Sequence, residues 1–168
     1  MNEPKRIFIV GHMGAGKFLL AEALAKKLGW QLIDANPSLE RYIGRSLKEI
    51  IGKQGEEAFH DCEAEIISHH INKEHIVVLL EEAVIATEKN RALLSNEFVI
   101  YLKVSTPTQI ERMRDGRTPL LPISDLKEFL DKQHVERDSL YEEVATLIIE
   151  SVSVEDDVNK IVKALEEK

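Results

Sequence analysis

A glycine-rich segment at residues 11–17 (GHMGAGK) fits the pattern G-x-x-x-x-G-K and lies between a short apolar run and a helix-like stretch. In this setting the glycines let backbone N–H groups curl around phosphate oxygens, and the lysine reaches the outer phosphates. Because strand, loop and helix all come in the required order, a chance glycine-rich turn is the weaker interpretation. We expect a nucleotide or another phosphate-like anion to contact Gly11, Gly14, Ala15, Gly16 and Lys17.

Short β-branched runs alternate with helical stretches along the rest of the chain. Strands are predicted at residues 7–10, 31–34, 76–80, 98–102 and 146–150. Helices are predicted at residues 18–28, about 46–53, 57–72, 106–114, 126–144 (as one or two helices) and 155–166. This alternation predicts an α/β fold with a parallel sheet of about five strands and helices on both faces. The glycine-rich loop after the first strand makes the expected fold one of the P-loop NTPase type.

The size and charge of the chain exclude several classes of protein. Its 168 residues suit a single domain over 1–168, without a linker or repeat. Thirty acidic residues against 22 Lys and Arg give a net charge of −8, which argues against a general nucleic-acid or anionic-membrane binder. One cysteine, Cys62, excludes an internal disulfide framework, and no run is long enough for a signal peptide or membrane span. We expect a cytoplasmic protein with no nucleic-acid or membrane partner.

Several segments, spread over nearly the whole chain, resemble the shikimate kinase family. They are residues 7–28, 32–34 and 55–59 (GEEAF), Arg117 with 119–121, and Arg137 with 140–145 (LYEEVA). The resemblance implies a five-stranded parallel sheet, a substrate-binding region at about 34–62 and a mobile lid at about 112–124. It also implies transfer of the γ-phosphoryl group of ATP to a hydroxyl of shikimate, with Mg²⁺.

Five residues match functional positions of that family. Lys17 matches the phosphate-binding lysine, and Asp34 matches the first acid of an Asp-x-Asp motif that supports the metal through water. Arg117 resembles the lid arginine that closes on the phosphates, although a threonine interrupts the usual Arg-Pro-Leu-Leu. Arg112 stands where the family places an arginine against the adenine, and Arg137 resembles the arginine that grips the shikimate carboxylate.

Four positions depart from the family pattern. Phe18 replaces the Ser or Thr whose hydroxyl ligates Mg²⁺. Asn36 replaces the second acid of Asp-x-Asp, which holds substrate hydroxyls and can take the proton. His60 replaces an arginine whose bidentate grip on a carboxylate an imidazole cannot reproduce. Leu80-Glu81-Glu82 stands where the family has three consecutive glycines.

Together these departures favour an impaired kinase that retains at most weak binding of ATP, ADP or another anion, with Mg²⁺ held poorly. Its role would then be binding or regulation, with an unidentified protein as one conceivable partner. An active shikimate kinase or related small-molecule kinase is the first alternative. An interaction module that binds no nucleotide is the second.

Histidines occur close together at His69, His70 and His75, and His60 lies near Cys62. Adjacent histidines on a helix cannot both face one ion, and residues two apart point to different helix faces. Surface or packing roles are therefore the favoured interpretation of all four histidines.

Overall fold

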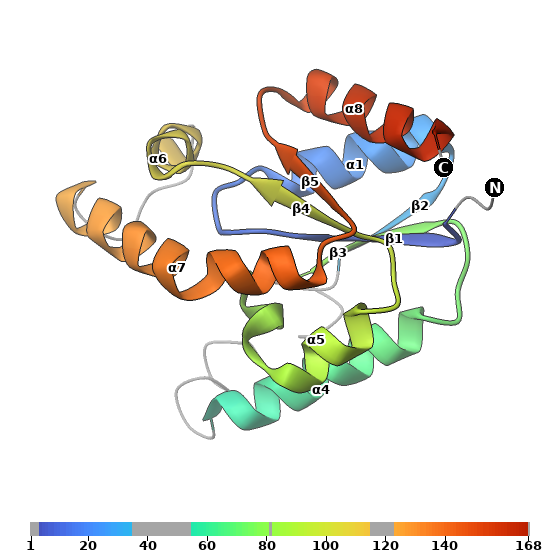
Figure 1. Cartoon of the computed structure of the whole chain (residues 1–168), viewed down its shortest axis with the longest axis horizontal. Coiled ribbons are helices and arrows are strands. Elements are labelled where there is room, and N and C mark those ends of the chain that lie inside the picture. Colours follow the sequence, from blue (N-terminus) through green and yellow to red (C-terminus); the bar gives the residue numbers. More distant parts are fainter. Residues whose placement is uncertain (1–3, 35–54, 81, 115–122, 168) are drawn as a thin grey trace.

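The computed structural model describes residues 4–34, 55–80, 82–114 and 123–167, and a parallel sheet forms the centre of this part of the chain (Figure 1). The strand order is β2-β3-β1-β4-β5. The strands are β1 (Arg6–Val10), β2 (Gln31–Asp34), β3 (Ile76–Leu79), β4 (Val99–Lys103) and β5 (Leu147–Glu150). Phe8 of β1 pairs with both Val78 and Val99, so β1 lies in the middle of the sheet. The predicted α/β fold with a parallel sheet is confirmed.

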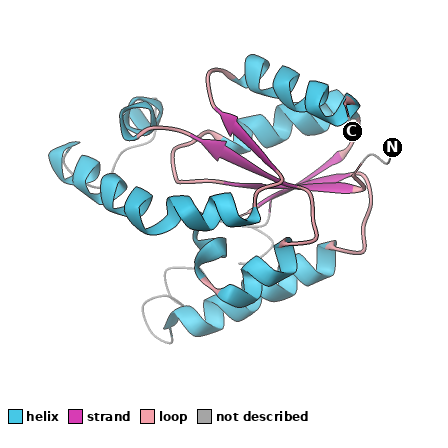
Figure 2. Ribbon diagram, viewed as in Figure 1, coloured by secondary structure: helices cyan, strands magenta, loops and turns pink. Residues whose placement is uncertain are grey.

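Helices cover both faces of this sheet (Figures 1 and 2). The helical elements are α1 (Lys17–Leu28), α4 (Gly55–His70), the 3₁₀ helix η1 (Glu82–Ala86), α5 (Glu88–Leu94), α6 (Thr106–Arg114), α7 (Ile123–Val144) and α8 (Val154–Glu166). Helices α1 and α8 lie side by side on one face, and α4, α5 and α7 lie on the other. The carboxyl ends of the strands point toward α6 and the outer part of α7, which places the loops that follow β1 and β4 at that edge.

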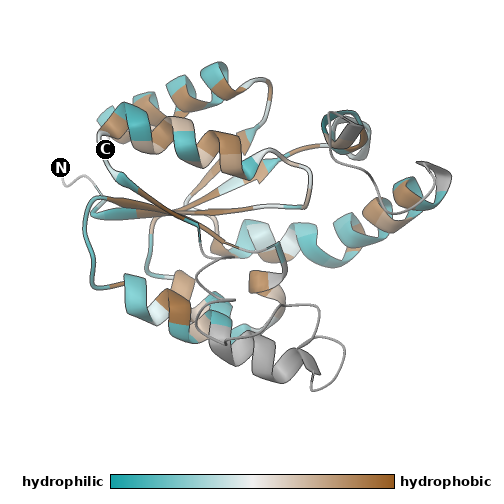
Figure 3. Ribbon diagram, turned by 180° about the vertical axis from the view of Figure 1, so that it is seen from behind, coloured by the Kyte–Doolittle hydropathy of each residue, from teal (hydrophilic) through white to brown (hydrophobic). Residues whose placement is uncertain are grey.

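Each face of the sheet builds its own apolar core, because neighbouring residues of a strand point to opposite faces. Ile7 and Ile9 of β1 pack with Leu24 of α1 and Ile161 of α8. Phe8, one residue along, packs instead into the cluster formed with α4, α5 and α7. Apolar colouring accordingly runs along the central strands, between more polar outer helix surfaces (Figure 3).

Helix α1 follows the phosphate loop and is held by one buried face. Leu20, Ala21, Leu24 and Ala25 are buried at helical spacing, which packs this face against the sheet and α8. Gly29 ends the helix with φ +71°, a left-handed conformation that glycine adopts without strain, and its N–H bonds to carbonyls of the last turn. The predicted stop at Gly29 is confirmed.

The segment after β3 differs from the sequence-based expectation, which placed no helix there. Thr87 caps α5, since its hydroxyl oxygen accepts the N–H of Asn90 at 3.4 Å. The apolar residues of η1 and the seven residues of α5 form too short a periodic pattern to predict a helix from the sequence.

Residues 126–144, predicted as one or two helices, belong to one helix, α7. The helix expected at 46–53 lies outside the described residues. Across the described parts of the chain, no helix has the length and apolar character needed to span a membrane.

The buried His70 at the end of α4 makes the stability of the fold sensitive to acid. Burial, helped by the nearby charges of Lys73 and His69, lowers the pKa of His70 from 6.5 to about 4. The folded state therefore favours the neutral ring, so this stability is complete above pH 6.5 and is lost as the pH falls toward 4. We expect His70→Gln to reduce the loss of unfolding free energy between pH 7 and 4.5, by on the order of 2–3 kcal/mol.

Urea unfolding at several pH values measures this slope. His69→Gln is the comparison variant: His69 is exposed on the same helix turn and acts on His70 only through its charge, so we expect a smaller change in the slope. An unchanged slope in His70→Gln would show that other groups cause the acid sensitivity.

Candidate functional site

The loop between β1 and α1 has the backbone geometry of a phosphate cradle. Gly14 and Gly16 adopt positive φ values of +72° and +92°, and a Cβ on Gly14 would lie 2.7 Å from the side chain of Met113. Lys17 Nζ donates to the carbonyls of Gly11 and His12, at 2.9 Å each, so its ammonium folds over the loop. Because α1 begins at Lys17, the helix N-terminus adds a partial positive charge there. The predicted loop residues thus form one turn between β1 and α1, with Lys17 folded back over it.

A cleft of about 680 Å³ opens beside this loop. Its other walls come from α6 and from residues 151–154 between β5 and α8. Arg112 of α6 connects two of the walls: its guanidinium donates to the carbonyl of Ala15 and to the hydroxyl of Ser151. Ser151 in turn donates to Asp157 at 2.6 Å. The volume is in the range of sites that bind small organic ligands, so the loop and cleft together suit a nucleoside phosphate.

Three further residues predicted to affect the site lie near the loop or at the same sheet edge. Phe18 and Glu82 both line the cleft, and 39% of Phe18 is exposed. Asp34 is the last residue of β2, where it pairs with Leu79 of β3. The residue after the loop lysine and the first residue of η1 therefore both belong to the wall of the cleft.

Comparison with known proteins covers almost the full length of the chain. The family model for shikimate kinase matches residues 13–166. The shikimate kinase of Legionella pneumophila (strain Corby) is 36% identical over 165 residues, which cover 96% of this chain and 94% of the relative. The chain belongs to the shikimate kinase family. The shikimate kinase of Francisella tularensis subsp. holarctica (strain FTNF002-00 / FTA) is 34% identical over 166 residues, with the same shares covered.

Solved shikimate kinases share the fold. The enzyme from Acinetobacter baumannii, solved in complex with shikimate, superposes with a TM-score of 0.86 at 30% identity, covering 98% of this chain and 94% of its own. The enzyme from Bacteroides thetaiotaomicron superposes with a TM-score of 0.87 at 23% identity, covering 96% and 98%. At that lower identity the second comparison supports the fold alone.

Part of the site expected from the shikimate kinase pattern lies outside the described residues. Asn36, Glu81 and Arg117 are among them, as is the side chain of His60. Most of the predicted substrate-binding region and lid therefore has no described geometry. Arg137, the expected carboxylate-binding residue, is partly exposed on α7, one turn before Tyr141.

The phosphate loop lacks the side-chain oxygen that ligates Mg²⁺ in the family pattern. A hydroxyl after the loop lysine would ligate the ion, and Phe18 supplies no oxygen at that position. Asp34 keeps a carboxylate at the end of β2, where it would act through water. The loop therefore keeps the glycines and the lysine of the pattern but lacks the hydroxyl that would ligate the metal.

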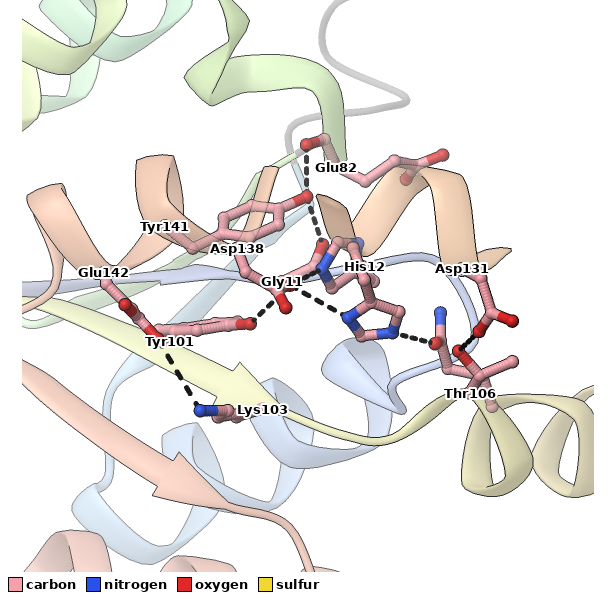
Figure 4. Close-up of polar contacts among 12 residues, drawn as sticks. Gly11, His12, Glu82, Tyr101, Lys103, Thr106, Asp131, Asp138, Tyr141 and Glu142 are labelled. Atoms are coloured by element: carbon pink, nitrogen blue, oxygen red, sulfur yellow. Dashed lines mark hydrogen bonds and ion pairs between the residues drawn. The ribbon is translucent and has the colours of Figure 1, made fainter. Parts of the chain in front are cut away.

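A hydrogen-bonded cluster that no sequence motif indicates lies next to the loop (Figure 4). Asp138 of α7 contacts His12 Nε2 at 2.6 Å and His134 Nδ1 at 2.9 Å, and it also accepts from the hydroxyl of Tyr101. Burial lowers the pKa of His12 from 6.5 to about 4. Burial alone would raise the pKa of Asp138, but its hydrogen bonds with the two histidines lower it overall. The sequence offered one indication of this cluster: His134 and Asp138 are four residues apart on a predicted helix and so lie on the same face. Nothing in the sequence indicated that His12 joins them.

Tyr141 connects the loop to both α7 and η1. Its buried hydroxyl lies 2.6 Å from the carbonyl oxygen of Glu82 and 3.2 Å from that of Gly11. We expect Tyr141→Phe to lower the free energy of unfolding by about 1–3 kcal/mol, because both carbonyls lose this donor in a buried place. Chemical denaturation measures the change.

Tyr101→Phe is the comparison variant. Its hydroxyl makes a longer bond of 3.3 Å to Asp138, whose carboxylate also has the two histidines as partners. We expect the smaller loss from Tyr101→Phe, and the reverse order would contradict the role given to Tyr141.

Proposed function

We propose that this shikimate kinase family member binds a nucleoside phosphate in the cleft beside the loop and transfers its phosphoryl group poorly. The observation that carries the proposal is Phe18, which lines the cleft directly after the intact loop and Lys17. The loop N–H groups, the lysine and the start of α1 attract phosphate without help from a metal. Arg112 and residues 151–154 form the part of the cleft that suits the nucleoside.

Slow transfer follows from the charges beside the loop. Neutralising and positioning phosphate charge is most of what a phosphoryl-transfer enzyme does, and Phe18 removes one metal ligand from that task. Glu82, an acidic residue, is part of the cleft wall. At a separation of ~5 Å and an effective dielectric of ~20, a carboxylate repels each unit of phosphoryl charge by about 3 kcal/mol.

An active shikimate kinase that uses Mg-ATP is the second candidate. Lys17, Asp34 and Arg137 are all present at family positions, and the similar enzyme from Acinetobacter baumannii was solved with shikimate bound. In this case Arg137 would hold the substrate carboxylate. Efficient turnover with shikimate would favour this candidate over the first.

Nucleotide titration tests the binding that the proposal requires. We expect ADP to bind at least as tightly as ATP, because Glu82 stands where the family pattern has a glycine beside the γ-phosphate, and its negative charge would oppose that phosphate. We also expect EDTA to change the affinity by less than about 1 kcal/mol, since the loop supplies no side-chain ligand for Mg²⁺. Isothermal titration with ATP and ADP, each with and without Mg²⁺, measures both effects.

Paired lysine variants locate that binding. Lys17→Met should weaken ADP binding about tenfold or more, since it removes a charge-assisted contact of ~1.5–3 kcal/mol. Lys26→Met is the matched control, because Lys26 is exposed in the last turn of the same helix. A clear preference for Mg-ATP over ADP, or equal binding by the two variants, would contradict the proposal.

A further inference from the structure

Two histidines and one aspartate converge at the edge of the phosphate loop, and Figure 4 labels two of them, His12 and Asp138. His12 lies in the loop, whereas His134 and Asp138 lie on α7, and one potential ligand atom from each falls within 4.8 Å of the others. The side chain of His12 is 1% exposed, that of His134 is 17% exposed and that of Asp138 is 36% exposed. The cluster is therefore buried on the loop side and accessible from the α7 side.

Hydrogen bonding determines which nitrogen of His134 carries a proton. Gln109 Nε2 donates to the carbonyl of Met13 at 2.8 Å, which fixes the orientation of the amide and makes its Oε1 an acceptor. His134 Nε2 lies 2.6 Å from that oxygen and must donate to it. In the neutral ring, the remaining nitrogen, Nδ1, then carries a lone pair rather than a proton.

This lone pair faces a carboxylate oxygen. Asp138 Oδ1 lies 2.9 Å from His134 Nδ1 and is also the atom contacted by His12 and Tyr101. Two acceptors at that separation repel each other unless a cation lies with them. That cation is either a proton or a metal ion.

We propose that His12 Nε2, His134 Nδ1 and the Asp138 carboxylate form a binding site for a divalent transition-metal ion of the zinc class, with water as the fourth ligand. Two imidazoles and one carboxylate are typical zinc ligands, whereas magnesium prefers oxygen ligands alone. The outer contacts also fit: Gln109 holds the far nitrogen of His134, and the Tyr101 hydroxyl holds Asp138. This site is separate from the position after Lys17 where the family pattern places its magnesium ligand.

The distances show what must move when the ion enters. Ligand atoms on a tetrahedral ion with bonds of about 2.0–2.1 Å lie ~3.3 Å apart, whereas Asp138 Oδ1 is 2.6 Å and 2.9 Å from the two nitrogens. Asp138 is partly exposed on α7, so its carboxylate has room to withdraw. His12 Nε2 lies 2.6 Å from Asp138 Oδ1, so without metal it donates its proton to the carboxylate, and binding of the ion through Nε2 requires the ring proton to move to Nδ1. The bound ion would link the phosphate loop to α7, the helix that carries Arg137.

Zinc titration of the full chain, prepared without a histidine tag, tests the site. Isothermal titration at pH 7 should find one Zn²⁺ per chain with a dissociation constant of about 1 μM or tighter. Co²⁺ should give the visible absorption of a tetrahedral complex. His134→Gln and the near-isosteric Asp138→Asn should each weaken zinc binding at least about 100-fold, and Gln109→Ala about 10-fold or more. His69→Gln, at an exposed histidine of α4, should leave binding unchanged.

Long-range ¹H–¹⁵N NMR of the wild-type histidine rings gives a readout that does not depend on how the variants fold. One equivalent of Zn²⁺ should shift Nδ1 of His134 and Nε2 of His12 and leave the other histidine rings in place. The proposal is overturned if the wild-type chain binds no stoichiometric zinc, or if zinc shifts only the exposed histidines. A doubly protonated His134 at pH 7 without zinc binding would likewise overturn it, because the cation beside Asp138 is then a proton.

Discussion

Purified protein supplied with Mg-ATP and shikimate is expected to turn over at least about 100-fold more slowly than the ~10 s⁻¹ typical of enzymes. Asn36 can hydrogen-bond a substrate hydroxyl but cannot accept its proton, and losing a positioned base costs about 10²–10⁴ in rate. His60 and Phe18 remove a bidentate arginine and a metal ligand from the family pattern. A coupled assay for ADP release, checked by direct detection of phosphorylated shikimate, measures the rate.

Reverting a single position to the family residue tests whether one departure or several cause the slow turnover. Phe18→Thr should restore little activity, because it returns the metal ligand while Asn36 and Glu82 remain. Turnover of the unaltered chain within about tenfold of the typical rate would establish the active-kinase candidate instead. Efficient turnover by Phe18→Thr alone would show that the metal ligand was the only essential loss.

The largest expected effect on stability comes from the buried face of α1. Leu24 is fully buried between α1, α8 and the sheet. We expect Leu24→Ala to lower the free energy of unfolding by about 2–5 kcal/mol, since it removes apolar contacts and leaves a cavity. Urea unfolding at pH 7 measures the loss, and nucleotide binding should weaken in parallel wherever the variant is partly unfolded.

Leu19→Ala is the control within the same helix. Leu19 is 55% exposed, so its truncation should change stability by no more than ~0.5 kcal/mol. Equal losses from the two variants would mean that the buried face of α1 does not provide the stability assigned to it.

The sequence alone was enough to predict the parallel sheet, the phosphate loop and the end of α1. These features depend on neighbours in the chain: runs such as residues 7–10 are continuously apolar, and Gly14 and Gly29 permit left-handed turns at fixed places. Helix α5 was not predicted from the sequence, because its seven residues are too few for a periodic pattern and a helix this short depends on packing for its stability.

The tertiary structure alone decided which distant side chains meet at the loop. His12 and Asp138 are 126 positions apart, and Arg112 reaches Ser151 across 39. No periodicity links such residues, because they meet only where the loops after β1, β4 and β5 share one edge of the sheet and α7 packs on the face beside that edge. The sequence determined that a phosphate loop forms and that its metal ligand is replaced by Phe18. Only packing determined that two imidazoles and a carboxylate meet beside that loop, since their contact depends on where α7 lies in space.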